Sequence, residues 1–105
     1  MSWHVLCAAQ DIPSGQGREF VVGGRVVAVF HAAERWFAID GMCAHQGGPL
    51  AQGKLDGRCL TCPWHGWQYD ISSGENLLTG KRMLDCFAVE ERDGEIWVEV
   101  AESPA

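Results

Sequence analysis

The stretch "CPWHGW" (62–67) concentrates reactive side chains in a segment that a proline and a glycine are expected to bend. Cys62 and His65 stand three positions apart, and Trp64 and Trp67 lie on either side of the histidine. A thiol and an imidazole at this spacing are compatible with a structural turn, half of a zinc site or half of a redox-active site. The rest of the chain has to distinguish these interpretations.

A second stretch, "GMCAHQGGPLAQG" (41–53), departs most clearly from a strand pattern. It carries four glycines, one proline and the only Cys-x-His of the chain, Cys43-Ala44-His45. Loops of this kind on a rigid β scaffold often carry function. Sixteen residues separate His45 from Cys62, so each of two loops supplies one thiolate and one imidazole.

Two kinds of metal site use two cysteines and two histidines. Zinc binds such a set tetrahedrally, but zinc sites usually group the cysteines in one half and the histidines in the other. The mixed halves of this chain suit a dinuclear iron site, in which each loop gives its cysteine to one iron and its histidine to the other. Rieske [2Fe–2S] centres have this arrangement.

The motifs resemble the two cluster-binding boxes of the Rieske [2Fe–2S] family. The first box is "CAHQGGPL" (43–50) and the second is "CPWHGWQYD" (62–70). The later "LTGKRMLDCFAVEERDGEIWVEV" (78–100) is similar to the closing segment of the family, in which a loop near the cluster leads into a final hairpin. The resemblance covers essentially the whole chain and implies one [2Fe–2S] cluster.

The resemblance also implies the four ligands of the cluster. Cys43 and Cys62 are expected to hold the buried iron, and His45 and His65 the outer iron. These four residues are the expected cofactor-binding and metal-binding set, and no catalytic residue is expected. Because the ligands must be deprotonated to bind, we expect cluster assembly to fail in acid.

Within the family, four positions bear on the redox potential, and three of them indicate a low-potential member. High-potential members join the two boxes by a disulfide, and the matching positions here are Gly48 and Trp64, which cannot form one. Those members also donate hydrogen bonds to sulfur from a serine and a tyrosine. Here Trp67 replaces the serine, whereas Tyr69 keeps the tyrosine place. Because such hydrogen bonds raise the potential, the sequence predicts a midpoint of about −150 to 0 mV.

The remaining sequence predicts short strands joined by tight turns. Paired glycines and Asp-Gly dipeptides between β-branched runs are strong hairpin signals. The predicted strand and hairpin segments are "REFVVGGRVVAVF" (18–30), "RWFAID" (35–40), "KLDGRCLTC" (54–62), "WQYDI" (67–71) and "CFAVEERDGEIWVEV" (86–100). They predict an all-β fold, a small antiparallel sandwich or barrel. The resemblance implies that a two-loop cluster-binding subdomain is inserted in it. The expected organisation is a single Rieske domain over residues 1–105, with its cluster-binding part at about 41–70.

Charge and composition exclude several function classes. Eight Lys and Arg against fourteen Asp and Glu give a net charge of −6, which argues against nucleic acid and against a polybasic membrane contact. Seven of the acids lie in the last quarter of the chain: Asp85, Glu90, Glu91, Asp93, Glu95, Glu99 and Glu102. This cluster is either a solvated acidic face or a steering surface for a basic partner.

Cysteine usage and the N-terminal sequence bear on location. No secretory signal is visible in "MSWHVLCAAQD" (1–11), and an odd total of five cysteines speaks for metal ligation rather than a disulfide framework. The expected location is the cytoplasm. Cys7, Cys59 and Cys86 are expected to be small buried apolar residues on strands. His4 and His31 are expected to be surface or hydrogen-bonded strand residues.

A cluster with four protein ligands has no open coordination position, so we expect an electron carrier rather than an enzyme. The family suggests a Rieske-type ferredoxin that accepts one electron from a flavin-containing reductase, and a small acidic carrier is expected to be a monomer. Its acceptor would be a terminal oxygenase of the aromatic-ring-hydroxylating type. The expected docking tip comprises His45, Gln46, Pro49, Trp64 and His65.

Three alternatives remain open. They are the small subunit of an assimilatory nitrite reductase, a detached N-terminal domain of an oxygenase, and a structural Cys2His2 zinc module. One further departure from the family concerns the loop "LTGKRML" (78–84), which lacks the prolines usual there. Lys81 and Arg82 are the residues expected on that side of the cluster.

Overall fold

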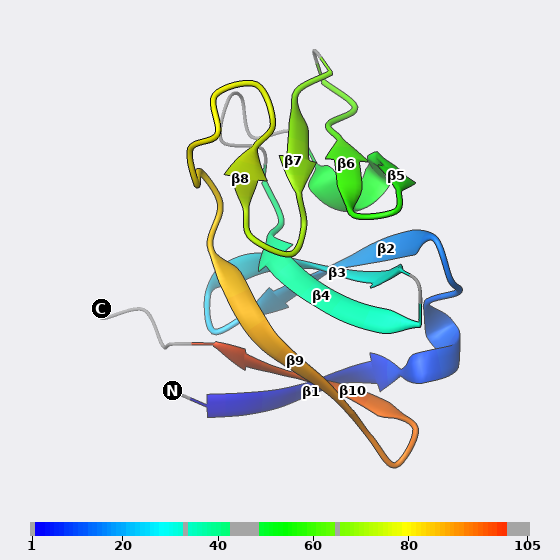
Figure 1. Ribbon diagram of the computed structural model, residues 1–105. Coiled ribbons are helices and arrows are strands. Elements are labelled where there is room, and N and C mark those ends of the chain that lie inside the picture. The colour runs from blue at the N-terminus through cyan, green and yellow to red at the C-terminus, as the bar shows by residue number, and fades with distance from the viewer. Residues whose placement is uncertain (1, 33, 43–48, 65, 101–105) are drawn as a thin grey trace.

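The protein folds into two antiparallel β-sheets, seen in a computed structural model that describes residues 2–32, 34–42, 49–64 and 66–100 (Figure 1). In these ranges the helical elements are two single turns of 3₁₀-helix, η1 (Ala9–Asp11) and η2 (Leu50–Gln52). The predicted all-β antiparallel class is therefore confirmed.

The larger sheet, called the base sheet here, has six strands in the order β1-β10-β9-β4-β3-β2. All of its neighbouring strands pair antiparallel. The strands are β1 (Ser2–Ala8), β2 (Gln16–Val22), β3 (Arg25–Ala32), β4 (Arg35–Asp40), β9 (Cys86–Arg92) and β10 (Glu95–Val100).

Two predicted hairpins of the base sheet have the turn residues that their geometry requires. Between β2 and β3, Gly23 and Gly24 both adopt positive φ values of 58° and 81°. Between β9 and β10, Asp93 and Gly94 adopt φ values of 51° and 80°. Two consecutive positive φ values give the turn whose twist matches that of the flanking strands.

The smaller sheet has the strand order β5-β6-β7-β8 and is inserted between β4 and β9. Its strands are β5 (Lys54–Asp56), β6 (Cys59–Thr61), β7 (Gln68–Asp70) and β8 (Glu75–Asn76). The β5–β6 turn falls at Gly57-Arg58, one residue later than the predicted Asp56-Gly57, because Asp56 pairs with Cys59. Residues 41–85, between the two base strands, are called the inserted segment below.

The core consists of two clusters on opposite faces of β3. Val27 and Val29 point to one face, and Ala28 and Phe30 to the other, and all four are fully buried. Burial on both faces explains the continuous apolar run "VVAVF" (26–30).

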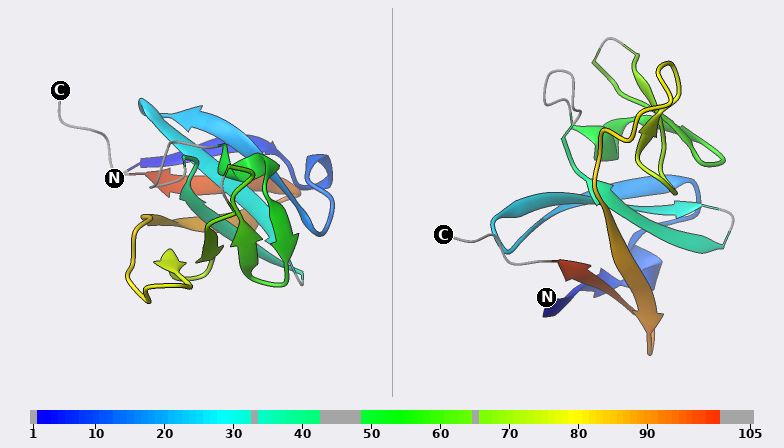
Figure 2. Two further views of the ribbon diagram at one scale, coloured as in Figure 1. Left: turned by 90° about the horizontal axis from the view of Figure 1, so that it is seen from above. Right: turned by 60° about the vertical axis from the view of Figure 1, so that its left-hand side comes forward.

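One core cluster lies within the curled base sheet, where Val27 and Val29 meet Ile96 and Val98 of β10. The other joins the base sheet to the inserted segment. Figure 1 and the right-hand view of Figure 2 place strands β5 to β8 on one side of the base sheet.

Candidate metal centre

The first predicted box is joined to the rest of the fold by two paired backbone segments, residues 41–42 and 49–50, called its neck here. Met42 and Pro49 form an isolated antiparallel bridge. Below it, the Gly41 amide donates to the Val26 carbonyl at 2.9 Å, and the Leu50 amide donates to the Gly41 carbonyl at 3.0 Å. Cys43 and His45 lie outside the described residues, so their role as ligands stays a prediction. The structure does fix where the loop that carries them begins and ends.

The two ends of segment 62–67 in the second box are also joined by a backbone hydrogen bond. The Cys62 amide donates to the Trp67 carbonyl at 2.7 Å, directly above the Thr61–Gln68 pair of β6 and β7. Gly66 adopts a φ of 70°, a left-handed conformation that glycine reaches without steric cost. "CPWHGW" (62–67) is thus the connection of a β-hairpin. His65 lies outside the described residues.

Cys62 is the predicted ligand that the structure describes, and its surroundings fit a metal-bound thiolate. Its side chain is buried, with 1% of the residue exposed. The backbone amide of Trp64 donates to its sulfur at 3.4 Å. An amide directed at sulfur stabilises negative charge there, as the hydrogen bonds around iron–sulfur clusters do. A thiolate ligand is therefore chemically suited to this position.

The necks of both boxes rest on the same core cluster. Leu50 at the end of the first neck is buried together with Leu60, Cys62 and Tyr69 of the second. Gly53 follows η2, and a Cβ atom there would lie 2.5 Å from the carbonyl oxygen of Thr61. The two backbones therefore approach closely just before Cys62. This proximity explains how the predicted β5–β6 hairpin brings the end of the first box at Leu50 close to the start of the second at Cys62.

Three aromatic residues of the second box differ in their burial. Tyr69 is fully buried in the core cluster that includes Cys62, and the half-buried Trp67 packs against that cluster. Trp64 is 49% exposed, as expected for a residue of the docking tip. Donation from Tyr69 to a cluster sulfur stays a prediction.

The loop after β8 is ordered by Asn76, a residue that the sequence analysis missed. Asn76 is 2% exposed, and its side-chain oxygen accepts from the Leu78 and Thr79 amides at 2.9 and 3.2 Å. An asparagine followed by a turn is a recognised signal for such local bonds. They hold the loop in shape without the prolines that the family usually has there.

A groove of about 500 Å³ separates this loop from the second box. It is lined by Gly66, Trp67, Gln68, Asn76, Leu77, Leu78 and Thr79. This lining mixes the apolar Trp67, Leu77 and Leu78 with polar side chains. Arg82 forms an ion pair with Asp85 at 3.7 Å. The placement of Lys81 and Arg82 on that side of the cluster stays a prediction.

The remaining cysteines lie on strands as predicted, but they are half-buried rather than buried. Cys7, Cys59 and Cys86 are free thiols on β1, β6 and β9. Burial raises the pKa of Cys7 and of Cys86, so both thiols stay protonated near neutral pH. Among the described residues there is no group of three or more potential metal-binding side chains; three of the four predicted ligands lie outside that set.

The two strand histidines differ from each other. His31 has Nδ1 3.0 Å from the Ile12 carbonyl oxygen and stacks on Trp36 with ring centroids 4.1 Å apart. This confirms it as a hydrogen-bonded strand residue. His4 has a buried Nε2 that contacts no hydrogen-bond partner in the described part of the chain, which the prediction did not anticipate.

The acidic cluster of the last quarter is partly neutralised. Asp85 pairs with Arg25 at 3.0 Å, and Glu90 pairs with Arg92 at 2.8 Å. Glu91 accepts a hydrogen bond from the Trp36 indole at 3.3 Å. In the ranges that the structure describes, no helix has the length and apolar character needed to cross a membrane.

Residues 2–87 match the Rieske [2Fe–2S] domain. The chain belongs to the Rieske [2Fe–2S] family. Its cofactor is one Rieske-type [2Fe–2S] cluster, which favours the iron–sulfur interpretation of the two boxes over the zinc interpretation.

Rieske ferredoxins are among the relatives that match this chain over nearly its full length. Ferredoxin CarAc of Metapseudomonas resinovorans is 32% identical over 98 residues, covering 91% of this chain and 92% of that protein. A chain in the complex of reduced oxygenase and oxidized ferredoxin in carbazole 1,9a-dioxygenase has a TM-score of 0.85 at 30% identity. That match covers 98% of this Rieske chain and 97% of the other.

Other matches are more distant or involve longer proteins. A Mycobacterium tuberculosis protein provisionally assigned as an NADH-dependent nitrite reductase small subunit has a TM-score of 0.87 at 20% identity. It matches over 95% of this chain and 96% of its own, and at that identity the likeness shows the fold alone. This Rieske chain spans 16% to 45% of the length of four further curated relatives.

Proposed function

We propose that this protein is a Rieske-type ferredoxin, a one-electron carrier and not an enzyme by itself. Its donor would be a flavin-containing reductase, and its acceptor a terminal oxygenase of the aromatic-ring-hydroxylating type. The observation that carries the proposal is the match to ferredoxin CarAc over about nine-tenths of both chains. The proposed organisation is a single Rieske domain over residues 1–105, with the cluster-binding part at about 41–70.

The proposed ligands are Cys43 and Cys62 for one iron and His45 and His65 for the other. The bound cluster supplies reversible one-electron chemistry. The protein contributes a buried Cys62 sulfur, an amide of Trp64 directed at it, and two paired necks on one core.

The exposed apolar residues support docking through the inserted segment. In the part of the chain that the structure describes, all but two of the large exposed hydrophobic side chains lie in that segment. Its members are Met42, Trp64, Leu77, Leu78 and Met83, whereas Val5 and Val21 lie on the base sheet. An apolar patch beside a redox centre suits the small, short-lived contacts of electron-transfer partners. We propose the tip around Trp64 and Pro49 as the acceptor contact.

Substitution of Trp64 by glutamate tests the docking tip. Trp64→Glu is expected to slow electron delivery to the acceptor oxygenase about tenfold, because it places a charge in an apolar contact, while the visible spectrum stays unchanged. Val5→Glu is the matched control, since Val5 is 48% exposed against 49% for Trp64 but lies on β1. Equal turnover of both variants with the acceptor would exclude this surface.

The cofactor and its ligands can be tested without a partner. The purified protein is expected to show visible bands that dithionite bleaches, and alanine at any of Cys43, His45, Cys62 or His65 is expected to abolish them. Voltammetry is expected to give a midpoint of about −150 to 0 mV. A midpoint above about +200 mV would contradict the low-potential assignment.

A nitrite reductase small subunit is the second candidate, supported by the fold likeness alone. The two candidates separate in a reconstituted assay, because a ferredoxin must reduce an oxygenase, whereas a small subunit must co-purify with a sirohaem enzyme. We also propose a cytoplasmic, monomeric carrier. The three free thiols Cys7, Cys59 and Cys86 fit a reducing compartment.

A further inference from the structure

The chain passes between the base sheet and the inserted segment at two adjacent points. It leaves the base sheet after Asp40, at the end of β4, and returns at Asp85, before β9. β4 and β9 are neighbours in the base sheet, but their ladder consists of only two residue pairs, Ala38–Phe87 and Ile39–Cys86. Something beyond this short ladder has to hold the two crossing points together.

Asp40 and Asp85 prolong the contact past the end of the ladder. The Asp40 amide donates to the Asp85 carbonyl at 3.0 Å, and the Asp85 amide donates to a carboxylate oxygen of Asp40 at 2.7 Å. The two carboxylates are thereby brought close together. Two negatively charged carboxylates that lie close together repel each other unless a cation lies between them.

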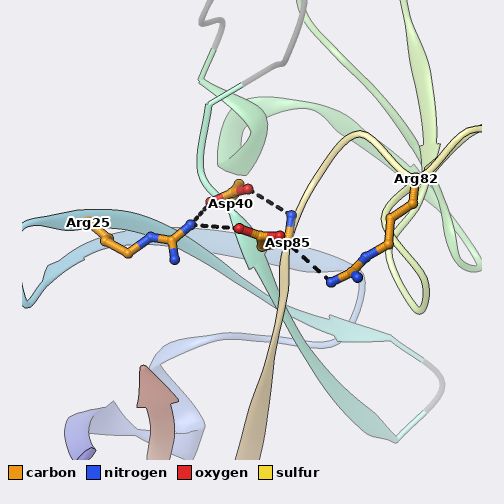
Figure 3. Close-up of polar contacts among 4 residues, drawn as sticks. All are labelled: Arg25, Asp40, Arg82 and Asp85. Atoms are coloured by element: carbon orange, nitrogen blue, oxygen red, sulfur yellow. Dashed lines mark hydrogen bonds and ion pairs between the residues drawn. The ribbon is translucent and has the colours of Figure 1, made fainter. Parts of the chain in front are cut away.

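Arg25 is that cation (Figure 3). One nitrogen of its guanidinium, Nη2, donates to Asp40 at 2.9 Å and to Asp85 at 3.0 Å. Its Cζ also lies 4.9 Å from the centre of the Phe87 ring on β9. The hydrogen bond to Asp85 raises the pKa of Arg25, and the side chain stays charged. Arg25 thus contacts β4 through Asp40, β9 through Phe87, and Asp85 directly before β9.

The residue after Arg25 supports the same junction. The Val26 carbonyl accepts the Gly41 amide at 2.9 Å, and a Cβ atom at position 41 would lie 2.5 Å from a methyl group of Val26. The start of β3 therefore supports the neck of the first ligand loop through a backbone hydrogen bond. Arg25 links Asp40, directly before that neck, to Asp85 through two ion pairs.

We propose that Arg25 is a positioning residue that holds the inserted segment, and with it both ligand loops, on the base sheet. Arg25 bridges the two points at which the chain crosses. Its loss would leave two adjacent carboxylates at the junction with no cation between them, because Arg82 pairs with Asp85 alone, at 3.7 Å. The junction would then open locally more often, while the rest of the base sheet stayed closed.

Hydrogen exchange of the cluster-loaded protein tests this directly. In Arg25→Gln, amides of Asp40, Gly41 and Asp85 are expected to exchange about 5-fold faster, the factor for about 1 kcal/mol of a partly exposed ion pair. Amides of β2 are expected to keep their wild-type rates. Loss of the visible bands under excess iron chelator is expected to accelerate by a similar factor.

Two further variants separate positioning from general stability. Arg25→Lys is expected to restore most of the protection, because a single nitrogen makes both hydrogen bonds and an ammonium group has donors for both. Arg92→Gln is the matched control. Arg92 pairs with Glu90 of the same strand and lies over the rings of Trp3 and Trp97, so its contacts stay within the base sheet.

Two outcomes would overturn the proposal. The first is wild-type exchange at the junction in Arg25→Gln. The second is acceleration of the same size in β2 as at the junction, which would show that Arg25 contributes only to overall stability. Neither result depends on the identity of the redox partners, so the proposal stands or falls separately from the ferredoxin function.

Discussion

Substituting Gly53 by alanine should push the two ligand loops apart. Gly53 has an extended backbone with φ −71° and ψ 164°, which any residue adopts, so alanine tests the available space alone. Its Cβ would lie 2.5 Å from the Thr61 carbonyl oxygen and 2.9 Å from Leu60, where ordinary contacts begin at 3.4 Å. Thr61 is paired with Lys54 in the β5–β6 ladder, so its carbonyl cannot move alone.

The size of the effect follows from this overlap. Overpacking of this kind typically costs about 1–3 kcal/mol. The stiffer unfolded chain of an alanine variant offsets about 0.4–1 kcal/mol of that cost. A net loss of about 1–2 kcal/mol lowers the Tm of a domain of this size by about 4–16 °C. Because Gly53 packs just before Cys62, we also expect the cluster content to fall.

Thermal melting and iron per chain measure the two effects. Gly57→Ala is the control, since a Cβ atom there meets nothing within 4 Å although φ is +61°. It is expected to lose about 1 kcal/mol of stability through the backbone alone and to keep its cluster at 25 °C. The reasoning fails if Gly53→Ala has the wild-type Tm and iron content, or if Gly57→Ala loses as much iron.

Three further predictions concern single side chains. Tyr69→Phe is expected to lower the midpoint potential by about 20–60 mV, as one hydrogen bond of about 0.5–1.5 kcal/mol to a reduced cluster requires; an unchanged voltammogram would make Tyr69 a core residue only. Cys7 and Cys86 are expected to react slowly with iodoacetamide at pH 7, since burial raises the pKa of both; peptide mass spectrometry would refute this by finding rapid labelling. Burial raises the pKa of Asp70, but hydrogen bonds from Ser72 outweigh it and leave the pKa below its usual value. The wild type is therefore expected to have a larger free energy of unfolding in urea than Asp70→Asn at pH 7, and this difference is expected to disappear as the pH falls below about 4. A pH-independent difference would contradict this reasoning.

The fold was predictable from the sequence because its signals are local. Consecutive glycines at 23–24 and the Asp93-Gly94 pair need positive φ, and strands alternate around them. The family resemblance then placed the two boxes on connections between strands. The β5–β6 turn was displaced by one residue because Asp-Gly predicts a turn without fixing which pair closes it, and the Asp56–Cys59 pairing decided that.

Features that depend on contacts between distant residues could not be predicted in this way. The necks of the boxes pair Met42 with Pro49 and Cys62 with Trp67, and proline and tryptophan give no periodic signal for such pairing. The half-burial of the cysteines on β1, β6 and β9 was missed because the cover over each strand face depends on distant segments that pack on it. Asn76 was missed because a buried asparagine is distinguishable from an exposed one only by its partners.

Arg25 shows most clearly why composition and periodicity are not enough. In the sequence it is the residue after a Gly-Gly turn, where an exposed arginine is unremarkable. Its carboxylate partners are 15 and 60 residues away, and they converge because β4 and β9 are neighbours in the base sheet although the inserted segment separates them in the sequence. The chain has a net charge of −6, with only eight Lys and Arg against fourteen Asp and Glu. Arg25 lies where Asp40 and Asp85 meet. It turns the repulsion between these two carboxylates into a link between the base sheet and the ligand loops.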